Sequence, residues 1–148
     1  RRLNNMLDKE FIIRKIDMIT ADLEHLRELQ GFTINEIALD FLKYSALKNI
    51  LMEIIGRAID INSHIIAELI PPESQTPRGY KDTFLLLGRL EILPDGFARE
   101  IAQSAGFRNA IVHDYNDIDK RLVYKKVDDI ISQYAAYCGH IRNSKKVF

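Results

Sequence analysis

Residues 51–69, with the sequence LMEIIGRAIDINSHIIAEL, decide the fold. Apolar side chains recur there in steps of three and four, the spacing of one face of an α-helix: they are Leu51, Ile54, Ala58, Ile61, Ile65 and Leu69. The stripe continues upstream through Tyr44, Phe41 and Ile37, so the sequence predicts one long helix with a buried face. Gly56 lies inside this helix and allows a kink or the close approach of another element.

Helical spacing also governs the segments on either side of this stretch. Upstream, a predicted helix that ends at Gly31 carries the apolar stripe Ile12, Ile16, Ile19, Leu23 and Leu26. Thr33 and Glu36 have the spacing of a capping box and mark the start of the long helix. Downstream of a proline-containing loop over 71–79, the last predicted helix carries Val123, Val127, Ile130, Tyr134, Tyr137 and Ile141.

Two shorter helices are expected between that loop and the last helix. The first spans about 81–93 and the second about 97–112, and the breaker sequence Pro-Asp-Gly at 94–96 separates them. No stretch shows the alternation of a strand. We therefore expect an all-α, up-and-down bundle of about five helices. Residues 1–148 would form it as a single domain, with a C-terminal tail over about 143–148 that frays.

The composition excludes several classes of protein. The chain of 148 residues is 47% hydrophobic, and its 21 basic and 21 acidic residues cancel. Without a net positive charge, RNA binding needs a local basic patch or one that two chains form together. No apolar run is long enough to cross a membrane. The lone Cys138 cannot form an internal disulfide and is expected to be a small core residue. These features predict a cytoplasmic protein that does not associate with membranes.

The residues with the chemistry of a functional site lie within 108–115, RNAIVHDY. Arg108 offers a planar, permanently charged set of donors to phosphate oxygens. His113 titrates near neutral pH and can give or take a proton, while Asn109 and Tyr115 are able to orient bound RNA. If one helix continued through the segment, Arg108 and His113 would lie roughly 140° apart. Either the helix unwinds before His113, or a second chain completes the site.

The segment resembles the Arg-x4-His-x-Tyr motif of the HepT toxins, a branch of the HEPN superfamily. Arg108, His113 and Tyr115 occupy the three motif positions, and Asn109 matches the polar residue that often follows the arginine. Residues 58–67, AIDINSHIIA, resemble the second-helix signature of the family, and residues 80–84, YKDTF, resemble the start of its third helix. The resemblance therefore covers nearly the whole chain.

This resemblance implies a HEPN-like homodimer that cuts RNA without a metal ion or a cofactor. His113 would be the general acid or base, and Arg108 would stabilise charge on phosphorus while the ribose 2′-oxygen attacks. The resemblance also implies the toxin of a type VII-like toxin–antitoxin system. Its cognate partner would be a minimal nucleotidyltransferase antitoxin of the MntA type, which neutralises the toxin by adding AMP to the motif tyrosine, here Tyr115.

From the residues alone, plainer interpretations of the motif stay open. His113 also fits a helix C-cap, and Arg108 fits a surface ion pair. No combination of His, Cys and carboxylates has the spacing of metal ligands, so no metal site is predicted. The alternative function is a non-catalytic HEPN adaptor that presents a nucleotide or a binding surface to a nucleotidyltransferase.

A second polar stripe on the long helix consists of Glu53, Arg57, Asp60 and His64. Glu53 and Arg57 are expected to pair on a solvated face. For Asp60 and His64 two interpretations are equally open. Either they line the site and orient RNA or Arg108, or they are surface residues whose four-residue spacing permits a mutual hydrogen bond.

Overall fold

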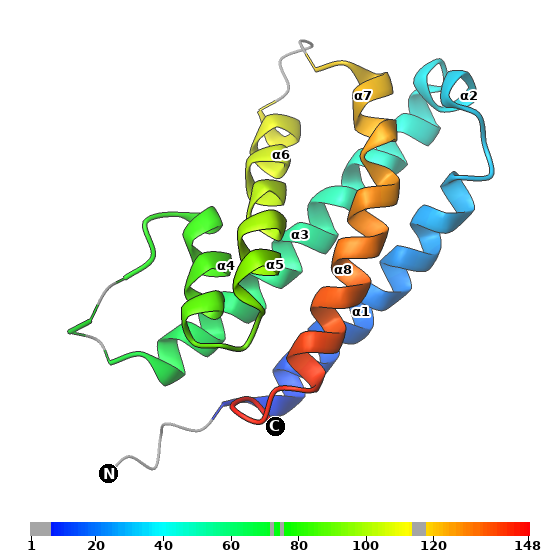
Figure 1. Cartoon of the computed structure of the whole chain (residues 1–148). Coiled ribbons are helices and arrows are strands. Elements are labelled where there is room, and N and C mark those ends of the chain that lie inside the picture. Colours follow the sequence, from blue (N-terminus) through cyan, green and yellow to red (C-terminus); the bar gives the residue numbers. More distant parts are fainter. Residues whose placement is uncertain (1–6, 72, 75, 114–117) are drawn as a thin grey trace.

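The computed structural model describes residues 7–71, 73–74, 76–113 and 118–148 (Figure 1). Within these ranges the chain forms helices and no strands, which confirms the all-α prediction. The helices are α1 Lys9–Leu29, α2 Ile34–Ala38, α3 Phe41–Leu69, α4 Tyr80–Arg89, α5 Asp95–Ile101, α6 Gln103–Val112, α7 Lys120–Lys125 and α8 Val127–Arg142. Across these ranges no helix combines the length and the apolar character that a membrane span needs.

The long helix α3 is the centre of the bundle. It packs against α1, α2, α4, α6 and α7, and α8 packs against α1. In Figure 1, α1 and α6 run in one direction while α3 and α8 run in the opposite direction, as an up-and-down bundle requires. The predicted stripe of α3 is buried as expected from Tyr44 to Ile65.

Short polar side chains determine where the first helices begin. Thr33 and Glu36 form both hydrogen bonds of the predicted capping box, at 3.1 and 2.8 Å. Asp40 then starts a new helix, because its carboxylate accepts from the backbone N–H of Lys43 at 3.0 Å. That hydrogen bond also lowers the pKa of Asp40. The predicted single helix is therefore interrupted, and the prediction that Phe41 is buried is wrong: its side chain is 78% exposed.

Two further predicted helices are interrupted, so about five predicted helices appear as eight helical segments in the described ranges. The helix expected over 97–112 divides at Ala102 into α5 and α6, and the last helix divides at Lys126 into α7 and α8. The tail over 143–148, which the sequence predicts to fray, contributes Val147 to the hydrophobic core. Val147 is only 2% exposed, and its N–H donates to the carbonyl of Ser144.

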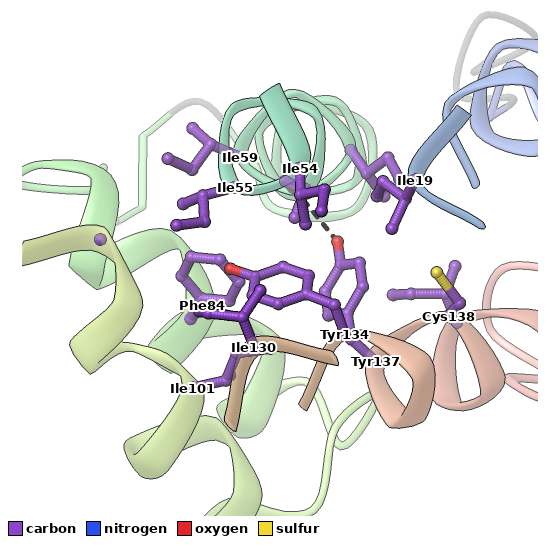
Figure 2. Close-up of a cluster of buried hydrophobic side chains, with 14 of the residues drawn as sticks. Ile19, Ile54, Ile55, Ile59, Phe84, Ile101, Ile130, Tyr134, Tyr137 and Cys138 are labelled. Carbon is purple, nitrogen blue, oxygen red and sulfur yellow. Dashed lines mark hydrogen bonds between the residues drawn. The ribbon is translucent and has the colours of Figure 1, made fainter. Parts of the chain in front are cut away.

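The core lies between α3, α1 and α8. Figure 2 shows Ile54, Ile55 and Ile59 of α3 facing Tyr134 and Tyr137 of α8. Both tyrosine rings are fully buried, so they pack the core and are not open to bases from solution. Cys138 is buried as expected, and burial raises the pKa of its thiol to about 11.

A buried polar network ties α3 to α4 and α8. Asn62 has no exposed surface, so both ends of its amide need partners inside the protein. Its Nδ2 donates to Thr83 Oγ1 at 3.1 Å, and its Oδ1 accepts from the Tyr137 hydroxyl at 2.6 Å. Thr83 in turn donates to the backbone carbonyl of Tyr80 at 2.7 Å. The network therefore places the first turn of α4 relative to α3.

Removing the Tyr137 hydroxyl tests the importance of this network. We expect Tyr137→Phe to lower the free energy of unfolding by about 1–3 kcal/mol, because it leaves the buried Asn62 oxygen without its donor. The matched control is Tyr124→Phe, which removes a half-buried hydroxyl that donates to the carbonyl of Phe32. Water can replace that bond, so the loss should be closer to about 0.5 kcal/mol. Equal losses in urea unfolding would contradict a special role for Asn62.

Candidate functional site

Arg108 projects from α6 against the middle of α3. A Cβ placed on Gly56 would lie 3.6 Å from Arg108 Nε and 3.9 Å from Nη2. The guanidinium therefore occupies space that most side chains at position 56 would fill. The sequence predicted either a kink or a close approach at Gly56, and the close approach is what the structure shows. The contact also brings Arg108 beside the polar stripe of α3.

Tyr80, the first residue of α4, lies beside the same guanidinium. Arg108 Cζ is 5.6 Å from the centroid of the Tyr80 ring, within the range of a cation–π interaction. Arg108 Nε is buried and has no hydrogen-bond partner among the described residues. The arginine is thus held by the packing of α3 and by an aromatic ring.

A groove of about 510 Å³ opens at this point between α1, α3, α4 and α6. Its lining includes three cations, Lys15, Arg57 and Arg108. Lys15 Nζ lies 3.0 Å from an oxygen of Asp60, and Arg57 pairs with both Glu53 and Asp22. Over the described ranges Arg108 has no such carboxylate partner. Of these three cations, Arg108 is therefore the one that could pair with an anionic ligand without first breaking an ion pair.

His113 stands directly after the last residue of α6. It is the C-cap, with φ −100° and ψ 32°, and its N–H donates to the carbonyl of Asn109 at 3.0 Å. The helix therefore ends at His113, which keeps the last helical hydrogen bond, and it does not unwind before His113 as one of the two alternatives expected. The side chains of His113 and Asn109 are exposed, and neither lines the groove that contains Arg108. Tyr115, and the carboxylates Asp114 and Asp117 beside it, lie outside the described residues.

Asp60 and His64 have different partners, and only Asp60 lines the groove. Asp60 lines the groove and pairs with Lys15. His64 Nε2 accepts from the backbone N–H of Asp8 at 2.9 Å, and its ring packs against Phe11. Each residue thus bonds elsewhere, and the mutual hydrogen bond that their spacing permits does not form. Glu53 and Arg57 pair as expected, at 3.1 Å, but both line the groove beside Arg108, where only a solvated face was expected.

No sequence pattern assigned a functional role to Lys15 or Tyr80, although both line the groove. Their contacts with Asp60 and Arg108 join distant segments of the chain, so local spacing carries no signal for them. The one available hint was a large aromatic residue at the start of a predicted helix. Among the described residues, no group of three His, Cys, Asp or Glu could hold a metal ion.

Comparison with known proteins places these features in a family. A family model described as ribonuclease HepT-like matches residues 19–141. The tRNA nuclease HepT of Aphanizomenon flos-aquae (strain 2012/KM1/D3) is 30% identical over 137 residues, which are 93% of this chain and 91% of that protein.

Solved structures show the same fold at lower identity. A tri-AMPylated Shewanella oneidensis HEPN toxin in complex with an MNT antitoxin superposes with a TM-score of 0.79 at 22% identity, over 90% of this chain and 98% of that chain. A toxin–antitoxin structure with AMP-PNP gives a TM-score of 0.80 at 21% identity, over 91% and 99% of the two chains.

The contact between Gly56 and Arg108 can be tested through stability. We expect Gly56→Ala to raise the free energy of unfolding by about 0.5–1 kcal/mol, since its methyl group meets Arg108 at an ordinary contact distance. Gly56→Leu would reach into the position of the guanidinium and should cost about 1–3 kcal/mol. Gly139 of α8, where an added Cβ meets nothing within 4 Å, is the matched control. A Gly56→Leu protein as stable as Gly56→Ala would refute the contact.

Proposed function

The chain belongs to the ribonuclease HepT-like family, and on that premise we propose that it is a metal-independent RNA endonuclease. The proposal rests on the burial and the charge environment of Arg108. It is a half-buried cation at the wall of a groove, and no described carboxylate neutralises it. A permanently charged, planar donor of this kind suits the oxygens of a phosphodiester.

The proposed reaction is an internal transesterification of RNA. The ribose 2′-oxygen attacks the adjacent phosphorus while a histidine accepts the 2′-hydroxyl proton. The bond from phosphorus to the 5′-oxygen breaks, and that oxygen receives a proton from an acid. The products carry a 2′,3′-cyclic phosphate and a 5′-hydroxyl. In this scheme His113 transfers protons, and Arg108 stabilises the negative charge that develops on the phosphoryl oxygens.

We propose that two copies of the chain form the complete site. Within one chain Arg108 faces the groove, whereas His113 is exposed at the end of α6. One exposed stripe of α6 consists of Gly106, Asn109, Ala110 and His113. A Cβ on Gly106 would meet nothing within 4 Å, so a second helix has room to approach. A two-fold axis along this stripe would bring both His113 side chains to one site.

We further propose that a minimal nucleotidyltransferase antitoxin controls the activity. The Shewanella HEPN toxin is tri-AMPylated and bound to an MNT antitoxin. Here the acceptor would be the phenol of Tyr115. Its oxygen attacks the α-phosphorus of ATP, pyrophosphate leaves and the phenolic proton is lost. Negatively charged AMP groups close to His113 would repel the RNA backbone and occupy the space that RNA needs.

Replacement of His113 tests the proposed nuclease. We expect His113→Ala to reduce cleavage of a cellular RNA pool that includes tRNA by about 10²- to 10⁴-fold, the usual contribution of a positioned acid or base. The control is His25→Ala, because His25 is an exposed histidine on α1 that does not line the groove. Cleavage by His113→Ala at the wild-type rate, in protein free of AMP, would remove His113 from the mechanism.

Incubation with the cognate nucleotidyltransferase and ATP tests the regulation. Mass spectrometry should find AMP on the peptide that contains Tyr115 and none on the peptide that contains Tyr80, although Tyr80 is 50% exposed. The Tyr115→Phe protein should stay unmodified and keep its nuclease activity in the presence of the partner. Modification elsewhere, with Tyr115 untouched, would contradict the proposed site.

A non-catalytic adaptor is the second candidate. Its support is the charge balance of the groove, where Lys15 and Arg57 are already neutralised by carboxylates. An adaptor would bind the nucleotidyltransferase and nucleotide without cutting RNA. Inactivity of both wild-type and His113→Ala proteins, each folded, dimeric and unmodified at Tyr115, would favour it.

A further inference from the structure

The guanidinium of Arg108 has contacts with two elements other than its own helix. The backbone of Gly56 on α3 leaves room for Nε and Nη2, and the ring of Tyr80 on α4 faces Cζ at 5.6 Å. Ordinary buried arginines are oriented by carboxylates or carbonyls, but the described residues supply no hydrogen-bond partner for Nε. The orientation of the Arg108 side chain therefore depends on shape and on the aromatic ring.

The backbone of Tyr80 is itself held in place. Its carbonyl accepts from Thr83 Oγ1 at 2.7 Å, and Thr83 Oγ1 accepts from the fully buried Asn62 at 3.1 Å. Two residues before Tyr80, the N–H of Arg78 donates to the carboxylate of Asp82. Although half of the Tyr80 side chain is exposed, the start of α4 is thus bonded both to α3 and to the preceding loop.

We propose that Tyr80 is a positioning residue that acts through Arg108. Its ring restrains the guanidinium against Gly56, so that the outer nitrogens of Arg108 are presented to a phosphate in the groove. The ring needs no hydrogen bond of its own and does not compete with the ligand for the donors of the arginine. This inference rests on the proposed function, because it assigns to Arg108 a phosphodiester as its ligand.

Two substitutions of Tyr80 distinguish the effect of its aromatic ring from the effect of its hydroxyl. In Tyr80→Leu the apolar bulk remains and the cation–π interaction is lost, so kcat for RNA cleavage should fall about 3- to 30-fold with little change in KM. Tyr80→Phe keeps the ring and should recover most of that loss. Phe41→Leu, a matched change at an exposed aromatic residue at the far end of α3, is the control.

A second measurement follows the arginine itself and does not depend on cleavage. The Nε–H signal of Arg108 in an ¹⁵N spectrum of the unmodified full chain is identified by its absence from Arg108→Lys. Because Nε is buried, its proton should exchange slowly with water in the wild type and in Tyr80→Phe. In Tyr80→Leu the exchange should be about 3- to 30-fold faster, since the restrained state loses the cation–π interaction.

The two measurements have distinct outcomes. Faster exchange and slower cleavage in Tyr80→Leu, with recovery in Tyr80→Phe, support the positioning role. Unchanged exchange in Tyr80→Leu overturns it, as does a Tyr80→Phe protein that is as impaired as Tyr80→Leu. If the wild type does not cut RNA, the proposed nuclease function fails, while the exchange rates still decide whether Tyr80 restrains Arg108.

Discussion

The requirement that buried Asn62 find hydrogen-bond partners constrains the arrangement of four helices. An amide without partners in the core costs about 1–3 kcal/mol, so Asn62 holds the Tyr137 hydroxyl of α8 on one side and Thr83 of α4 on the other. Through Thr83 the constraint reaches the first residue of α4, Tyr80. The ring of Tyr80 contacts the guanidinium of Arg108 on α6. A polar residue in the core and the cation of the groove are therefore linked through short contacts.

Among the cations of the groove, Arg108 differs from the other two in having no carboxylate partner in the described ranges. Lys15 and Arg57 pair with three carboxylates, those of Asp60, Glu53 and Asp22, so these pairs carry no surplus positive charge. Arg108 is the exception, and burial of its Nε reduces the screening of its charge by water. Arginine suits this position because it stays protonated when partly desolvated, which a lysine or a histidine does not.

Much of this architecture could be predicted from sequence because it is local. The helical stripes, the Thr33–Glu36 capping box and the end of the helix beside His113 all depend on residues a few positions apart. The break before Phe41 was missed, since the apolar spacing continues through Asp40 and only the side-chain cap of Asp40 reveals a new helix. The packed tail was missed because the burial of Val147 depends on distant elements.

The same distinction applies to the site. The motif segment predicts Arg108 and His113 as site residues, and Gly56 indicated a close approach. The residues around Arg108 come from distant parts of the chain. Tyr80 is the first residue of α4, two helices before α6, and Lys15 lies on α1. From the sequence, His64 was as good a candidate for the groove as Asp60. In the structure it instead accepts a hydrogen bond from the backbone at the start of α1. Its role depends on which helix happens to pack beside it.

The other proposals depend on one reaction, the cleavage of RNA by Arg108 and His113 through internal transesterification without a metal ion. The most direct test is to identify the ends of RNA cut by the purified, unmodified protein in the presence of EDTA. We expect undiminished cleavage that leaves 2′,3′-cyclic phosphates and 5′-hydroxyls. Products with 5′-phosphates and 3′-hydroxyls, or loss of cleavage on addition of EDTA, would contradict it.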